Sequence, residues 1–579
     1  MLRCVWVVVF AVFAAAGCRN GENGDPRPEV PARRLLVLSL DGLAWDLAQR
    51  KMGEGKMPHL AALVARGASA EGSVAAWPAK TAPSHASLWT GRWADGHGIM
   101  GNETPLLPHN AHTVFELRSG FDAEALRAEP IWRAAARQGR IVTVVQATQA
   151  DPGNPDDSGL PGLNIFGGYR DRVDSALVTA GVFAVDGRTF AIERDEGGLV
   201  VSSPPVRVRV RPGEFVAVDH PDVRGVFYLA IARLDDRGWT LLRSSYSRVS
   251  APSSSEAAEF RRAVGGYAYN AQKLGDDIRD GSGWKRDLYV AATRLNAERV
   301  RAAVLWAMDR HPADLTIAYL PQPDEALHAL LGRIDLLADR EAESLLDDVL
   351  GICDGLIGDL AAAVGDRGAI AVVSDHGMAP ADRVFFPNLA LERAGLLERD
   401  AAGRINLSKS QAVFSAAGDC VVINTADRVG GIVPTGEKDA WLQLAERALS
   451  RAAESALGAG TLEMFRPDGN SSDLAVGAEG DLWLAATCDG VRLNAVFSAD
   501  LPPKDAPLSR SISPVGTHSG DPRIPRLRGI AVYAGTGFRH VSAPGVRNID
   551  FAPTVARWLA VDPSLRTAGR PIVEFLEER

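Results

Sequence analysis

Three side chains stand directly after apolar runs, where a folded chain can present them to a metal ion. Asp41 follows the run LLVLSL, and Asp375 and His376 follow the run AIAVVS. Carboxylate and imidazole groups bind divalent cations such as zinc, so these residues are candidate ligands. A structural role is the alternative for both motifs. An Asp at a strand end also caps helices, and an adjacent Asp–His pair also forms internal hydrogen bonds.

Three further candidates come from the segments PDEALH and PVGTHSGDP. Asp324 and His328 are four residues apart, which places them on one face of a helix, where both can hold one ion. The same spacing also occurs in surface pairs that bind nothing. His518 lies in a Gly-rich loop and by itself indicates little. Together with the strand-end residues, these side chains make a set of six candidate ligands.

The segment from Trp77 to Asn102 contains a candidate nucleophile. Small residues from Ala82 to Ser87 would begin a helix, and the free amides at a helix N-terminus favour an anion. Thr81 places a hydroxyl at the front of that helix, where a metal or a base can activate it. Ser84 is a second polar candidate, although a Ser at a helix start is also a common helix cap.

Short apolar runs separated by amphipathic stretches predict how these residues are positioned. The runs are LLVLSL, IVTVVQA, LTIAYL, AIAVVS and GIAVYAG, which begin at residues 35, 141, 315, 369 and 529. Such runs are typical of buried parallel strands, and the stretches between them of crossover helices. We therefore predict an α/β core with a mostly parallel central sheet flanked by helices. Asp41, Asp324 and Asp375 would lie beyond the carboxyl ends of its strands, where ligands bind.

Two stretches depart from this pattern. One alternates strongly, as in PVRVRVRPGEFVAV, and predicts an antiparallel insertion. The other contains a long amphipathic helix from Asp439 to Leu457 and predicts a smaller α+β cap. We divide the chain into a signal peptide with a lipobox (1–18), a flexible tether (19–34), three parts of a catalytic core (35–150, 286–387 and 504–579), a β-rich insertion (151–285) and an α+β cap subdomain (388–503).

The N-terminus has the features of an export signal. Arg3 precedes an apolar run from Cys4 to Ala16, which is shorter than the roughly 18 residues that span a bilayer. The order Ala-Ala-Gly-Cys that ends at Cys18 resembles a bacterial lipobox, in which this cysteine is acylated. Ordinary cleavage after Ala16 and an uncleaved anchor are the alternatives. We expect an exported protein, lipid-anchored in the bacterial cell envelope or else periplasmic or secreted, whose membrane contact is that anchor.

Composition excludes two other classes. The net charge is −9 and no basic excess is present, so no nucleic-acid-binding surface is evident. Beyond the signal, the cysteines are Cys353, Cys420 and Cys488. Their odd number and wide spacing exclude a disulfide-rich scaffold and a cysteine zinc site. Whether any two of them pair stays open at this point.

Six motifs in this order resemble the type I phosphodiesterase/nucleotide pyrophosphatase family of the alkaline phosphatase superfamily. The resemblance runs from about Leu35 to the C-terminus and rests on KTAPSHASLWTG, HGIMGN, EPIWRAAARQG, PDEALH, SDHGM and GTH. It implies an alkaline-phosphatase-like core. It also implies hydrolysis of a small phosphate ester, either a diester or a pyrophosphate, through a phosphothreonine intermediate. The alternatives are a phosphotransferase, a phosphonate or monoester hydrolase of the same superfamily, and a non-catalytic binding lipoprotein.

The resemblance also implies two zinc ions, with manganese or another divalent ion as an alternative. One site would use Asp324, His328 and His518, and the other Asp41, Asp375 and His376, with Thr81 as the nucleophile and a ligand between the ions. Ser84 and Asn102 would contact the substrate. Ser84 departs from the family, which has Asn there, so the expected oxyanion contact is in doubt. Asn102 matches the family, with a structural role as its alternative.

Overall fold

The computed structural model describes residues 33–151, 157, 159–167, 172–267, 278, 283–415, 417–467, 474–493, 501–562 and 567–578. The predicted signal segment, its Cys18 and the tether up to residue 32 lie outside these residues. Within the part of the chain that the structure describes, no helix is both long and apolar enough to cross a membrane.

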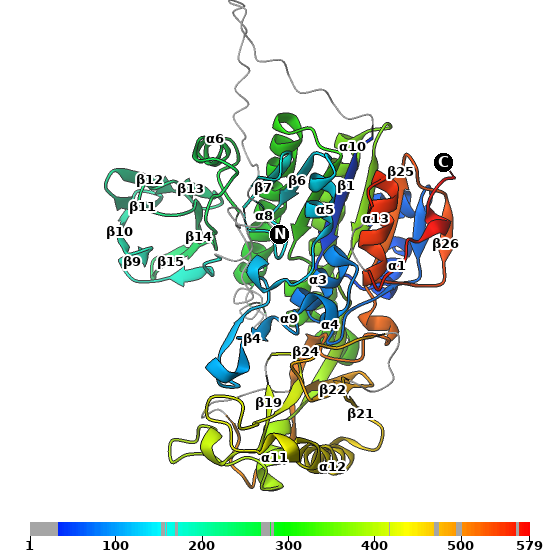
Figure 1. The fold of residues 1–579 in the computed structure, drawn as a ribbon. Helices are drawn as coiled ribbons and strands as arrows, with labels where there is room; N and C mark the ends of the chain where they lie inside the picture. Colours follow the sequence, from blue (N-terminus) through cyan, green and yellow to red (C-terminus); the bar gives the residue numbers. More distant parts are fainter. Residues whose placement is uncertain are drawn as a thin grey trace, which may run out of the picture.

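An eight-stranded sheet forms the centre of the molecule (Figure 1). Its strands, in spatial order, are β26 (Val541–Ala543), β2 (Ala68–Ala70), β25 (Ala531–Gly535), β17 (Ala369–Val373), β1 (Leu35–Leu40), β16 (Leu315–Leu320), β6 (Val142–Val145) and β7 (Leu163–Phe166). The five strands from β17 to β7 are parallel. β25 runs antiparallel to both of its neighbours, so the expectation of a parallel strand in GIAVYAG was wrong.

Helices cover both faces of this sheet. Alternate residues of β1 point to opposite faces, and each set joins a different apolar core. Leu36, Leu38 and Leu40 pack in the core that includes residues of α1 (Trp45–Gly53), α2 (Pro58–Val64), α8 (Gly283–Arg310), α9 (Asp324–Leu337) and α10 (Arg340–Val364). Leu35 and Val37 pack in the core that includes residues of α3 (Thr81–Thr90), α5 (Ile131–Arg137) and α13 (Phe551–Leu559). The predicted α/β class with a mostly parallel sheet is confirmed.

A β-rich module follows β7 and lies to one side of the core (Figure 1). It consists of two four-stranded antiparallel sheets that share one apolar core, which contains Phe190 and Phe227. α6 (Ser254–Val264) follows it. The strands are β8 (Ala176–Val178), β9 (Val182–Val185), β10 (Arg188–Asp195), β11 (Gly198–Ser203), β12 (Val206–Val210), β13 (Val216–Val218), β14 (Phe227–Asp235) and β15 (Gly238–Arg243).

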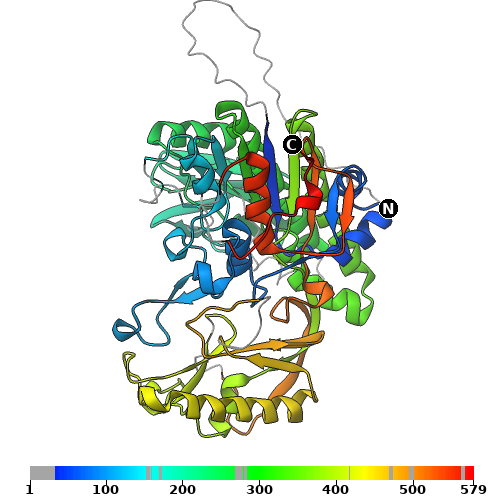
Figure 2. The same cartoon turned by 45° about the vertical axis from the view of Figure 1, so that its right-hand side comes forward.

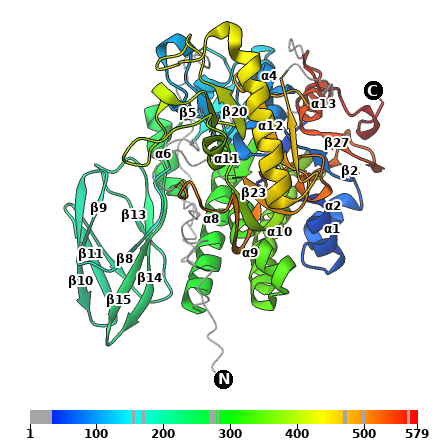
Figure 3. The ribbon, with the colours of Figure 1, turned by 90° about the horizontal axis from the view of Figure 1, so that it is seen from below.

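A second module lies below the core, and the long α12 (Lys438–Leu457) runs along its outer side (Figures 2 and 3). Its four-stranded antiparallel sheet has the order β19 (Ala412–Ser415), β20 (Cys420–Ile423), β22 (Leu482–Ala486) and β21 (Leu462–Phe465). α11 (Pro387–Arg393) packs beside α12. This module is called the cap from here on. It is joined to the core by a three-stranded sheet with the order β23 (Gly490–Leu493), β18 (Ala379–Phe385) and β24 (Ser509–Thr517).

The three cysteines of the described part are free thiols. Cys353 and Cys420 are buried, and Cys488 is exposed. Burial raises the pKa of the Cys353 thiol to about 12, so this side chain is a neutral core residue. The pairing that the sequence left open does not occur among these cysteines.

Candidate active site

The carboxyl ends of three neighbouring strands bring three carboxylates together. β1 lies between β16 and β17 and is parallel to both, so the residues that follow these strands share one edge of the sheet. Backbone hydrogen bonds lock the arrangement. The Asp41 amide donates to the Leu320 carbonyl at 3.1 Å, and the Asp324 amide donates to the Asp41 carbonyl at 3.0 Å. The Gly42 amide donates to Asp375 Oδ1 at 3.2 Å.

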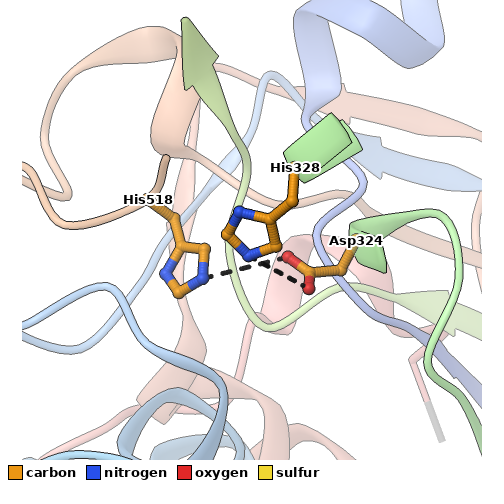
Figure 4. Close-up of side chains that lie close together, drawn as sticks. All are labelled: Asp324, His328 and His518. Carbon is orange, nitrogen blue, oxygen red and sulfur yellow. Dashed lines mark ion pairs between the residues drawn. The ribbon is translucent and has the colours of Figure 1, made fainter. Parts of the chain in front are cut away.

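The first ligand cluster consists of Asp324, His328 and His518 (Figure 4). Asp324 begins α9, and His328 follows one helical turn later, as the spacing predicts. His328 Nε2 lies 3.4 Å from Asp324 Oδ2, and His518 Nε2 lies 3.9 Å from Asp324 Oδ1. His518 comes from the loop after β24, so this cluster forms only when two distant segments meet.

The second cluster consists of Asp41, Asp375 and His376, all of them buried. His376 Nε2 lies 3.2 Å from Asp375 Oδ2 and 3.6 Å from Asp41 Oδ1. The Tyr319 hydroxyl donates a hydrogen bond to the other oxygen of Asp41. One carboxylate oxygen from each Asp and one ring nitrogen therefore face a common point.

Backbone carbonyls orient all three histidines of the two clusters. In each ring Nδ1 lies within hydrogen-bond distance of a carbonyl oxygen, at 2.9, 2.9 and 2.6 Å for His328, His376 and His518. A carbonyl accepts only, so each Nδ1 carries the proton and each Nε2 presents a lone pair. The acceptors are the carbonyls of Gly516, Gly377 and Ala79, respectively. This is the arrangement that holds imidazoles ready for metal coordination.

The carboxylates of the two clusters lack partners for part of their hydrogen-bonding capacity. Asp41 Oδ1, Asp324 Oδ1 and Asp375 Oδ2 are buried and accept no hydrogen bond from the described residues. Burial, and then the neighbouring charges of Asp375 and Asp324, raise the pKa of Asp41 well above its usual value. Buried anions normally require a countercharge, which a cation in each cluster would supply. The residues present therefore fit two divalent ions.

Thr81 is the first residue of α3, and its hydroxyl lies 3.5 Å from His376 Nε2. Thr81 lines a cavity of about 480 Å³, whose lining also includes the whole first cluster and Asp41 of the second. The sequence-predicted residues in this lining are Asp41, Thr81, Asn102, Asp324, His328 and His518. A hydroxyl at a helix N-terminus, beside two sets of metal-type ligands, has the surroundings that activate a nucleophile for attack on an anionic ester.

The two predicted substrate contacts lie in different environments. Asn102 lines the cavity, and its Oδ1 accepts a hydrogen bond from the Ala82 amide at 3.0 Å. Ser84 is fully buried inside α3, is not part of the cavity lining, and its hydroxyl has no partner among the described residues. The geometry thus offers Asn102 to a substrate and holds Ser84 in the protein interior.

Several charged residues of the cavity were not predicted as site residues. They are Lys80, Glu103, Arg172, Glu325, Asp419 and Arg492. Lys80, Glu103 and Glu325 each adjoin a predicted residue, and this adjacency was their only signal in the sequence. Burial raises the pKa of Glu325 to about 8. Arg172 borders the β-rich module, and Asp419 and Arg492 belong to the cap, so no local motif marks them.

Fold and site together define an α/β protein with a candidate two-ion centre and a buried threonine at the carboxyl edge of its sheet. The chain belongs to the type I phosphodiesterase/nucleotide pyrophosphatase family, whose family model matches residues 35–489. This match covers every predicted site residue of the fold except His518.

Curated relatives match only over short segments. An ectonucleotide pyrophosphatase/phosphodiesterase of Caenorhabditis elegans is 28% identical over 175 residues, which cover 28% of this chain and 19% of the relative. Ectonucleotide pyrophosphatase/phosphodiesterase family member 7 of Mus musculus is 30% identical over 112 residues, which cover 18% of this chain and 24% of the relative. The chain thus spans a quarter or less of the length of these relatives. The solved structure of murine ectonucleotide pyrophosphatase/phosphodiesterase 5 in complex with AMP matches 92% of this chain and 96% of that one, with 15% identity and a TM-score of 0.48.

Gly42 offers a test of how the strand ends position the first cluster. A Cβ at this position, where φ is +73°, would lie 2.8 Å from Asp324 Cβ and 2.9 Å from Asp324 Cα. Gly42→Ala should therefore displace Asp324 and remove about one bound metal equivalent, as measured by elemental analysis after metal loading. Gly55→Ala is the matched control, because Gly55 has φ of +72° and nothing within 4 Å. Equal metal content in the two variants would contradict the assignment of Asp324.

Proposed function

We propose that this chain is a metal-dependent hydrolase of phosphate diesters or pyrophosphates that works through a phosphothreonine intermediate at Thr81. One observation carries the proposal. Thr81 lines a cavity with the first ligand cluster and with Asp41 of the second, and each Asp of the two clusters keeps one buried oxygen that accepts no hydrogen bond from the described residues. Family membership supports the reaction class, since the matched family is that of type I phosphodiesterases and nucleotide pyrophosphatases. The Xenopus laevis relative, 31% identical over 128 residues, is named a bis(5'-adenosyl)-triphosphatase.

The chain's own residues would divide the work as follows. Thr81 Oγ attacks phosphorus and loses its proton, the bond from phosphorus to the ester oxygen breaks, and the alcohol or phosphate leaves on the opposite side. Water then cleaves the phosphothreonine and restores the hydroxyl. The side-chain NH2 group of Asn102 would hold a phosphoryl oxygen, while its Oδ1 accepts from the Ala82 amide. When bound, two zinc or other divalent ions would lower the pKa of the attacking groups and neutralise phosphoryl charge.

The surroundings of Thr81 favour a singly charged ester over a monoester, which carries about two charges. A bidentate Arg beside the nucleophile would suit the extra charge, but the next residues are Ala82, Pro83, Ser84 and His85. Burial lowers the pKa of His85, so its ring is neutral near pH 7. Lys80 is already paired with Asp419 at 2.7 Å. None of the four residues after Thr81 is part of the cavity lining, so none of them occupies the space beside Thr81.

For localisation, we propose export and lipid anchoring through Cys18. This proposal rests on the apolar segment and the lipobox of residues 1–18. The names of the relatives as ectoenzymes agree with an exported protein. Mass spectrometry of the protein from its membrane fraction would detect the acylated cysteine.

Thr81→Ala should lower turnover of bis-p-nitrophenyl phosphate on the order of 10³-fold or more, because the variant loses the hydroxyl that attacks phosphorus. Ser84→Ala is the matched control, since Ser84 lies three residues further on and is buried away from the cavity. Its effect should stay below about tenfold. Circular dichroism would show that both variants fold. A phosphorylation site that maps to Ser84 in the trapped intermediate would overturn the assignment.

The substrate charge provides the second test. The ratio of kcat/KM for bis-p-nitrophenyl phosphate to that for p-nitrophenyl phosphate, at one pH, should exceed one. The reason is that Lys80, the cation next to Thr81 in the chain, is already paired with Asp419. A preference for the monoester above about tenfold, or ~1.4 kcal/mol in transition-state terms, would refute the diesterase proposal.

A further inference from the structure

A loop of the cap reaches the residue that precedes the nucleophile. Asp419 lies between β19 and β20, and its Oδ1 accepts a hydrogen bond from the Lys80 ammonium at 2.7 Å. Lys80 is the N-cap of α3 and adjoins Thr81 in the chain. Both charged groups line the cavity and are largely buried, with side-chain exposures of 15% for Lys80 and 5% for Asp419. The ion pair therefore joins cap and core at the edge of the reaction site.

The backbone around Asp419 is packed too tightly to move freely. A Cβ on Gly418 would lie 2.7 Å from the Met100 carbonyl oxygen, and a Cβ on Gly101 would lie 2.7 Å from the Ala417 carbonyl oxygen. Asp419 itself has φ of +57°, a left-handed conformation that Asp and Asn adopt more readily than most residues. Its carbonyl accepts from the Leu484 amide at 2.9 Å, which fixes the loop to β22. The carboxylate is thus held at a set position relative to Lys80.

Residues 79–81, which the Lys80 ion pair anchors to the cap, carry two groups of the candidate site. The Ala79 carbonyl accepts the hydrogen bond from His518 Nδ1 at 2.6 Å and thereby aims His518 Nε2 at Asp324. Thr81 carries the hydroxyl. A shift of this three-residue segment would move the nucleophile and turn a ligand of the first cluster together. The same cap loop touches Gly101, the residue before Asn102, so it also supports the proposed substrate amide.

The ion pair between Lys80 and Asp419 is better suited to fixing the geometry of the site than to stabilising the fold. Asp419 Oδ2 is buried and has no hydrogen-bond partner among the described residues, so the carboxylate is only half satisfied. Desolvation of a buried ion pair offsets much of its attraction, and such pairs often contribute little net stability while they specify geometry. An Asn at position 419 keeps an oxygen that can accept from the Lys80 ammonium, so this change weakens the contact without leaving the buried ammonium unpaired.

We infer that Asp419 is a positioning residue: through Lys80, the cap sets the place of Thr81 and the orientation of His518. The inference rests on the proposed function, because positioning is measured by the reaction that Thr81 performs. Neither Asp419 nor the cap contact is needed to supply a reacting atom.

The experiment compares Asp419→Asn, Lys80→Met and the double variant. Asn keeps the size and tolerates the left-handed backbone, so only the charge is lost. Glu398→Gln is the matched control, because Glu398 forms a 2.7 Å ion pair with Lys409 in the same cap, with side chains 52% and 58% exposed. Steady-state kinetics on bis-p-nitrophenyl phosphate give kcat and KM. The amount of zinc that each variant retains in competition with a chelator reports on the cluster that contains His518, and this measurement does not depend on catalysis.

The expected result is a fall in kcat of about 10- to 100-fold for Asp419→Asn, of the size that misplacing a reacting group produces. KM should change by less than about threefold, and zinc retention should weaken. The double variant should resemble either single variant, because both remove one contact. The control should behave as the parent. Lys80→Met measures the same contact from the core side if Asp419→Asn fails to fold.

Three results would overturn the inference: an unchanged kcat in Asp419→Asn, a rise in KM alone, or effects of the two single variants that multiply in the double variant. A rise in KM alone would make the pair a substrate contact. A parent protein that does not hydrolyse the diester defeats the proposed function instead. Zinc retention in the variants would then still decide whether Asp419 positions His518.

Discussion

Repulsion among three buried carboxylates is the constraint on which the site depends. Asp41, Asp324 and Asp375 meet because β1 is parallel to both β16 and β17, and each carries one buried oxygen that accepts no hydrogen bond from the described residues. A fold that only maximised stability would have avoided this concentration of charge. This concentration of carboxylates, which the Nε2 atoms of three imidazoles face, is accounted for if divalent ions bind between these groups. The core sheet, covered by helices on both faces, provides the rigidity to hold the carboxylates in place.

The modules added to this core shape the cavity without contributing the predicted ligands. The cap supplies Asp419 and Arg492 to the wall, and Arg172 borders the β-rich module. The candidate ligands for cations and the residues of the outer cavity wall thus come from different parts of the chain: the ligands follow strands of the core or lie on one helix face, and the two modules add charged residues to the wall.

The α/β class and five of the six candidate ligands were predictable because each rests on a local pattern, whereas His518 was placed only by the family resemblance. A buried strand followed by Asp41 or Asp375, and the four-residue spacing of Asp324 and His328, need no knowledge of strand order. The direction of β25 was not predictable, since a strand buried on both faces has the same apolar pattern in either direction. Adjacency to Thr81 drew attention to Ser84, whereas the cavity is lined by Asn102 from a following loop. Asp419 had no signal, because its contact with Lys80 depends on how the cap docks, with 338 residues intervening.

The central claim, that the carboxyl edge of this sheet holds two cations, is tested most directly by anomalous diffraction from crystals of the zinc-loaded protein, with data collected at the zinc absorption edge. The account predicts two strong peaks. One lies among Asp41, Asp375 and His376, and the other among Asp324, His328 and His518. A fully loaded crystal with no peak at either cluster, or with zinc bound only elsewhere on the chain, would contradict it.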